Sequence, residues 1–210
     1  KKIKRIAILF PEYLGDYIML VPFLYELKNS FPNAKIDFYT TKRNVLLGKY
    51  HPAVSECYEM PVLHYNDQYH WQDAYKFIRR LRKEKYDLAY FTNDYLFWIC
   101  FLSGIKHIMT ENFSLLFRMF CIGTPAKYLR NNLRHTIERH INNIEFITNK
   151  KINKEDYNLS LGLPDSLVKM PENIKIPKPY IVINPDCHSV KNFEREFYIK
   201  LIKYLLEQGH

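Results

Sequence analysis

The sequence predicts an α/β fold built on a parallel sheet, and two observations favour this class. Short apolar runs, typical of strands buried on both faces, alternate with longer segments whose apolar residues recur at helical spacing. Such alternation is the pattern of successive βαβ units, in which helices cover a parallel sheet. We therefore expect a Rossmann-like sheet flanked by helices, and a chain of 210 residues is long enough to bury its own core.

The expected elements follow one another in that order. Residues 6–10 are short, apolar and β-branched, as a buried strand should be, and the helix expected at 16–29 carries Leu20 and Leu24 at helical spacing. Pro22 lies inside this helix and should kink it, because proline removes a backbone donor. The other predicted strands are residues 35–40, 54–60, 86–91 and 106–109, and the other predicted helices are 71–84, 94–103 and 132–148, with a less regular one near 113–121.

A second domain is expected to begin near the end of the chain. Prolines are frequent between residues 163 and 179, where the apolar periodicity fades. Beyond them, residues 180–184 resemble a buried strand and residues 193–207 a helix. The predicted division is an N-terminal domain at 1–170, a linker at 171–179 and the incomplete start of a second Rossmann-like domain at 180–210.

The loop after the first strand carries the most informative pair of residues. Gly15 and Asp16 stand between that strand and the first helix, at the carboxyl end of the strand, where open α/β sheets bind ligands. Glycine lets another molecule approach the backbone closely. Asp16 suits a helix N-cap, and it equally suits a general base whose ionised form the helix dipole favours. One residue could serve in both roles.

The wider sequence resembles the heptosyltransferase family, which is glycosyltransferase family 9. The resemblance begins with Gly15-Asp16 and the proline-bearing helix, and continues in the Phe-Pro-Asn-Ala-Lys-Ile-Asp turn at 31–37. Further along, Lys85-Tyr86-Asp87-Leu88 resembles the entry to the family's fourth strand. The Arg-His-x-x-Glu-Arg helix corresponds to residues 134–139, and the donor-phosphate loop to Asn184-Pro185 with Lys191.

This resemblance implies a fold, a reaction and roles for particular residues. The family's GT-B fold has two Rossmann-like domains that face each other across a cleft, the first of which binds the acceptor. Its members transfer heptose from ADP-heptose to the lipopolysaccharide inner core, with inversion and without an obligatory metal. By the same resemblance Asp16 is the proposed base, Gly15 borders the acceptor and Lys191 contacts the donor diphosphate.

The loop at residues 185–191 has the layout of an anion site. It joins a strand to a helix, and its amides together with Ser189 and Lys191 would face a diphosphate. Two positions depart from the family pattern, because Asp186 replaces a small residue and Phe193-Glu194 replaces Trp-Pro. An ordinary surface lysine is the alternative interpretation of Lys191.

Three further residues are candidates for acceptor binding. Asn93 follows the fourth strand together with Asp94, at the same edge of the sheet as Asp16. Arg134 and His135 lie on the helix predicted at 132–148, where an acidic acceptor could accept charge-assisted hydrogen bonds. Packing and solvent exposure are the alternative explanation for each of them.

The charge of the chain favours anionic partners. The net charge is +9, from 31 basic and 22 acidic residues. Many of the cations lie at residues 76–85, which is either a solvated helix face or a contact with anionic lipids or a lipopolysaccharide core. The apolar runs at 95–102 and 113–122 are too short to cross a bilayer and suit either buried helices or a contact with the membrane surface. We expect a cytoplasmic protein, with peripheral contact at the inner face of the inner membrane as an option.

Several classes of site do not fit the sequence. The four cysteines are widely spaced, as reduced thiols are, and the histidine pairs lack zinc-site spacing, so no metal and no cofactor are expected. The glycine fingerprint of dinucleotide-dependent oxidoreductases is missing. No standard nucleic-acid-binding signature occurs, and no nucleic acid partner is expected.

Two functions remain open at this point. The first is the acceptor-binding domain of an inverting glycosyltransferase that uses a nucleotide-sugar donor. A two-domain enzyme of this type needs about 300 residues, so we expect this chain to be an incomplete piece that is inactive alone. The alternative is a non-catalytic carbohydrate- or lipid-binding module that has lost its donor chemistry.

Overall fold

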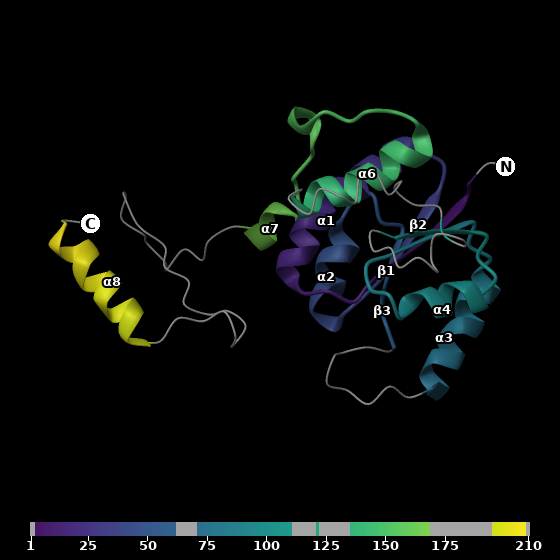
Figure 1. The fold of residues 1–210 in the computed structure, drawn as a ribbon, viewed down its shortest axis with the longest axis horizontal. Helices are drawn as coiled ribbons and strands as arrows, with labels where there is room; N and C mark the ends of the chain where they lie inside the picture. The colour runs from purple at the N-terminus through teal and green to yellow at the C-terminus, as the bar shows by residue number, and fades with distance from the viewer. Residues whose placement is uncertain (1–2, 62–70, 111–120, 122–134, 169–194, 209–210) are drawn as a thin grey trace. The chain divides into compact units, whose positions relative to one another are not determined.

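The computed structural model describes residues 3–61, 71–110, 121, 135–168 and 195–208 (Figure 1). The chain divides into two compact units, Lys1–Leu167 and Val168–His210. The predicted domain boundaries, with a linker at 171–179, lie among residues outside the described ranges and stay a prediction.

The first unit is built on a five-stranded parallel sheet with the order β3-β2-β1-β4-β5. In the centre of the sheet, Ile8 lies opposite Phe38 on one side and Tyr90 on the other. The predicted α/β class with a parallel sheet is therefore confirmed. The strands are β1 (Arg5–Phe10), β2 (Lys35–Thr40), β3 (Glu56–Glu59), β4 (Leu88–Phe91) and β5 (His107–Thr110).

Helices cover both faces of this sheet. Because successive strand residues point to opposite faces, each strand contributes side chains to two cores. Ile6 and Ile8 belong to a core that includes residues of α1 (Leu14–Ser30) and α6 (Thr136–Thr148), with α2 (Lys42–Tyr50) packed against it. Ala7 and Leu9 belong to a second core with residues of α3 (Trp71–Glu84) and α4 (Leu96–Leu102). Figure 1 shows α3 and α4 together, apart from α1, α2 and α6.

Most of the predicted elements are confirmed in the described residues. Strand β2 and helix α3 have the predicted bounds, whereas β3, β4 and α4 are shorter and α1 begins two residues earlier. Helix α1 continues through Pro22, and the predicted kink is not tested. The predicted strand at 180–184 lies outside the described residues, and so does the predicted helix near 113–121 except for Cys121, which is not helical. Helix α2, the 3-10 helix η2 (Lys154–Asp156) and the short α7 (Asp165–Val168) were not predicted.

Helix α8 (Arg195–Glu207) is the described element of the second unit. It confirms the helix predicted at 193–207. Several of its apolar residues, Phe197 and Ile202 among them, are exposed within the described part of the chain.

Candidate functional site

The candidate site lies at the carboxyl edge of the sheet, where β1 passes into α1. Asp16 is the third residue of α1, in its first turn, and is half-buried. The N-cap position belongs to Tyr13, whose side chain makes no capping hydrogen bond. Asp16 is therefore not the N-cap that one of the two interpretations required. Its carboxylate still benefits from the positive end of the helix dipole.

Gly15 leaves open space directly before Asp16. A Cβ atom added at this position would meet no other atom within 4 Å, and the backbone is not in the left-handed region that favours glycine. Neither internal packing nor backbone strain therefore requires a glycine here. The residue is exposed, so a ligand can come close to the backbone of the first helical turn.

Hydrogen bonds from two neighbouring elements hold the loop between β1 and α1. Thr92, directly after β4, donates its hydroxyl to Glu12 Oε1 at 3.0 Å. Asn44, in the first turn of α2, donates from Nδ2 to the Glu12 carbonyl oxygen at 2.9 Å. Glu12 thus links the loop after β1 to the end of β4 and to the start of α2. The sequence analysis missed these three residues, although the convergence of parallel strand ends at one edge was a usable signal.

Two buried polar atoms near the start of α2 have no hydrogen-bond partner among the described residues. They are Asn44 Oδ1 and Thr41 Oγ1. Thr41 occupies the N-cap position of α2 but its side chain does not cap the helix. Buried polar atoms without a protein partner normally form a hydrogen bond with water or with a ligand hydroxyl. They add hydrogen-bonding capacity beside the loop that carries Asp16.

Asn93 lies at the same edge as Gly15 and Asp16, since β4 pairs directly with β1. Its carbonyl oxygen accepts from Leu96 N at 3.0 Å, and that of Asp94 accepts from Phe97 N at 3.1 Å. The half-buried Asn93 thus belongs to the turn that enters α4. Partial desolvation raises the pKa of the Asp94 carboxyl.

His135 belongs to a different element. It is the N-cap residue of α6, and its Nδ1 accepts from Ile137 N at 3.3 Å. The side chain is exposed, so the capping role leaves it open to solvent. A histidine N-cap was not anticipated, because the predicted helix began at residue 132.

The other predicted site residues lie outside the described residues. They are Arg134, Ser189 and Lys191. Their roles stay predictions. Within the described ranges, no group of three or more His, Cys, Asp and Glu side chains is arranged to hold a metal ion.

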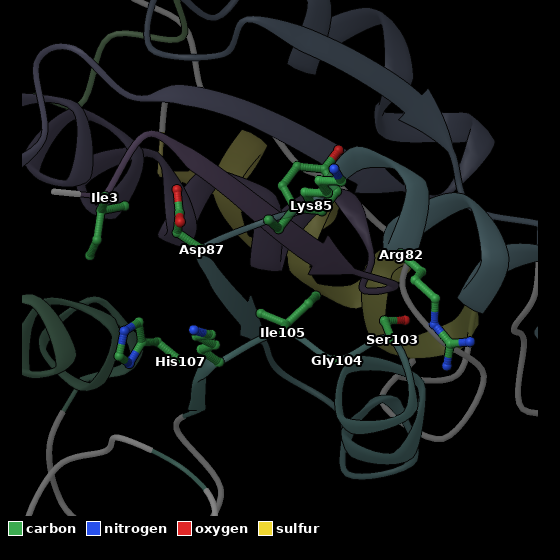
Figure 2. A pocket seen from close by; sticks show the side chains of 10 residues that line it. Ile3, Arg82, Lys85, Asp87, Ser103, Gly104, Ile105 and His107 are labelled. Carbon is green, nitrogen blue, oxygen red and sulfur yellow. The ribbon is translucent and has the colours of Figure 1, made fainter. Parts of the chain in front are cut away.

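A cavity of about 440 Å³ occurs at the opposite edge of the sheet (Figure 2). It lies where β4 and β5 begin, and its lining includes Arg82, Asp87 and His107. It is therefore separate from the carboxyl edge that carries Asp16.

The fold is similar to solved glycosyltransferases. The chain is similar to the glycosyl transferase family 9 from Veillonella parvula DSM 2008, with 22% identity and a TM-score of 0.56 over 68% of this chain and 41% of that chain. It is also similar to E. coli heptosyltransferase WaaC with ADP, with 16% identity and a TM-score of 0.66 over 98% of this chain and 65% of that chain. No protein-family model and no curated protein sequence matches it.

These similarities define the class of fold. The chain has the Rossmann-like α/β fold that these transferases contain, and the sequence resemblance to heptosyltransferases is matched at the level of structure. The chain spans 41% and 65% of the lengths of the two structures.

Proposed function

We propose that this chain forms the acceptor-binding side of an inverting glycosyltransferase of the heptosyltransferase type. The donor would be a nucleotide sugar, ADP-heptose, and the acceptor a lipopolysaccharide core. The observation that carries the proposal is Asp16 in the first turn of α1, with open space at Gly15, in a fold similar to heptosyltransferase WaaC. The activity is proposed for the product of the full reading frame.

The proposed reaction is a single displacement. An acceptor hydroxyl hydrogen-bonds to the Asp16 carboxylate, and its oxygen attacks the anomeric carbon of the donor sugar. The bond from that carbon to the diphosphate breaks through an oxocarbenium-like transition state, and the diphosphate leaves with the electron pair. The hydroxyl proton passes to Asp16. Ser189 and Lys191 are proposed to stabilise the charge on the leaving diphosphate.

The remaining candidates are proposed to position the acceptor. Gly15 would let the acceptor approach the first turn of α1 closely. Asn93 would bind from the same edge of the sheet, and Arg134 with His135 would bind anionic groups of the acceptor. Glu12 would act through the loop, since Thr92 and Asn44 fix its position.

No cofactor takes part in the proposed reaction. We propose a cytoplasmic location, which the free cysteines Cys57 and Cys100 support, because thiols stay unpaired in a reducing compartment. In the described part of the chain, no helix combines the length and apolar character needed to cross a bilayer.

The role of Asp16 is tested by Asp16→Asn, which keeps the shape of the side chain and removes the base. We expect kcat to fall about 100-fold or more, since general bases contribute on this scale. The acceptor KM should change little, because the interaction is strengthened only in the transition state.

Glu59→Gln is the matched control, since Glu59 is an exposed carboxylate at the end of β3, on the same edge of the sheet. Its kinetics should stay near those of the parent. A rise in KM with kcat unchanged in Asp16→Asn would show that Asp16 binds the acceptor without acting as its base.

A further inference from the structure

An exposed aromatic surface covers the outer side of α4. This seven-residue helix is apolar throughout, and its inner side buries Leu96 and Ile99. On its outer side Trp98 is 59% exposed, Phe101 41% and Leu102 49%. The Trp98 and Phe101 rings meet edge to face, with 6.1 Å between their centroids. Packing against the rest of the first unit therefore buries only about half of the residues of α4.

Helix α3 extends this surface and adds cations to it. Trp71 and Tyr75 are 70% and 56% exposed. They share one strip of the helix with Ile78 and Arg82, because residues three or four apart lie on the same face. The guanidinium of Arg79 lies 6.0 Å from the centre of the Tyr75 ring.

Two hydrogen bonds join the strip on α3 to the end of α4. Arg82 Nη2 donates to the carbonyl oxygen of Leu102 at 2.5 Å, and Ser103 Oγ donates to that of Ile78 at 3.4 Å. These bonds join the C-terminal parts of the two helices. We call the exposed aromatic and cationic residues of both helices the α3–α4 surface. Its members are Trp71, Tyr75, Arg79, Arg82, Trp98, Phe101 and Leu102.

The acidic residues of α3 lie away from this surface and are paired. Asp73 forms an ion pair with Lys76 at 3.4 Å, and Glu84 forms one with Arg5 at 2.7 Å. By helical spacing both acids stand on the opposite side of α3 from Tyr75. The α3–α4 surface is therefore aromatic and cationic, without a carboxylate of α3 in it.

The cavity in Figure 2 continues the cationic character beyond α4. Arg82 borders both the cavity and the α3–α4 surface, and Lys85 and Lys106 also line the cavity. Figure 2 shows Arg82 and Ser103 on one side of the cavity and His107 and Asp87 on the other. Asp87 Oδ2 accepts from the backbone amides of Lys4 and Arg5, which offsets its charge.

We propose that the α3–α4 surface docks on an anionic phospholipid bilayer. Trp98, Phe101 and Leu102 enter the boundary between headgroups and acyl chains, where aromatic side chains are favoured. Arg79 and Arg82 bind lipid phosphates at the rim, and the cavity beside Lys106 receives a further phosphate. The net charge of +9 adds long-range attraction to the same membrane. This proposal does not depend on sugar transfer.

The test is sedimentation of the protein with vesicles in the absence of any sugar substrate. The vesicles are phosphatidylcholine alone, or equimolar phosphatidylcholine and phosphatidylglycerol. The protein should bind only the anionic vesicles, with weaker binding at high salt. The double variant Trp98→Gln/Arg79→Gln should lower the partition coefficient about tenfold.

The matched control is Leu46→Gln/Lys49→Gln on α2, which removes one exposed apolar residue and one exposed cation from the other face of the sheet. It should bind anionic vesicles as the parent does. Equal losses in both double variants would overturn the proposal, because binding would then follow net charge alone. Circular dichroism checks that both variants are folded.

Tryptophan fluorescence locates the contact. The chain has two tryptophans, so Trp71→Phe leaves Trp98 as the single reporter. Its emission should shift to the blue with anionic vesicles and be quenched by brominated acyl chains. An unshifted spectrum, or a dimer in solution that Trp98→Gln dissociates, would overturn membrane docking.

Discussion

Asp37 is a buried carboxylate whose two hydrogen-bond partners come from two other segments of the chain. It is 2% exposed, and its Oδ2 accepts from Arg5 Nη2 at 2.8 Å and from the Tyr86 hydroxyl at 2.6 Å. Arg5 also pairs with Glu84, so one network joins β1, β2 and the end of α3. Burial lowers the pKa of Arg5, but its hydrogen bonds to Asp37 and Glu84 outweigh this and raise it.

Replacing Asp37 should therefore destabilise the fold strongly. We expect Asp37→Asn to lower the free energy of unfolding by about 2 kcal/mol, since it removes the charge of a buried carboxylate from a partly buried ion pair. Asp73→Asn, which breaks an exposed pair on α3, should cost less than about 0.5 kcal/mol. Urea denaturation measures both values. Equal effects would mean that the Asp37 network adds little to stability.

His51 makes stability depend on pH in the acidic range. It is buried, its Nδ1 accepts from Ala53 N at 3.2 Å, and burial lowers its pKa from 6.5 to about 4. The unfolded chain therefore binds more protons between these pKa values, so stability is full above about pH 6.5 and falls toward pH 4. We expect a loss of about 2 kcal/mol from this residue between pH 7 and pH 5.

The variant His51→Asn isolates this effect. The asparagine oxygen can accept from the amide two residues on, as Nδ1 does here, but it does not titrate. Its unfolding free energy should change less than that of the parent between pH 7 and pH 5. Parallel pH profiles would show that His51 protonates as easily in the folded protein as in the unfolded chain.

At the scale of elements, a helix or strand could be predicted from the sequence when its buried residues are apolar. Helix α3 was predicted with its bounds because Phe77 and Leu81 mark its buried side. Helix α2 was missed because its buried residues are Asn44 and Gly48, which carry no apolar signal. The strands were predicted from their apolar runs, since both faces of the sheet are covered.

Two glycines in helices should respond oppositely to alanine. A Cβ at Gly48 would lie 2.6 Å from Cys57 Sγ and 2.8 Å from Phe38 Cδ1, so Gly48→Ala should cost about 1–3 kcal/mol by overpacking. Gly15→Ala meets open space and should stabilise α1 by up to about 1 kcal/mol. Thermal unfolding compares the two variants.

Activity adds a second readout for Gly15. If the acceptor approaches the first turn of α1, Gly15→Ala should raise the acceptor KM although the protein is more stable. Unchanged kinetics in this variant would place the acceptor elsewhere.

At the scale of the whole molecule, the sheet explains why residues far apart in sequence form one candidate site. Parallel strands bring Asp16 and Asn93 to the same edge, which the sequence predicted because each residue follows closely after a predicted strand. The convergence of strand ends indicated that these loops meet, whereas the particular hydrogen bonds of Glu12 with Thr92 and Asn44 depend on loop conformations and could not be predicted. The sequence offered residues 76–85 and 95–102 as contacts with a membrane surface, but a short apolar run does not show which of its sides is buried.

The central claim is that the full reading-frame product transfers a sugar from a nucleotide donor. The most direct measurement is release of ADP from ADP-heptose with and without a lipopolysaccharide core acceptor. We predict release that requires the acceptor, is lost in Asp16→Asn, and gives a product of inverted anomeric configuration. A protein that binds the acceptor but neither binds ADP-heptose nor releases ADP would contradict the claim, and a non-catalytic binding module would then replace it.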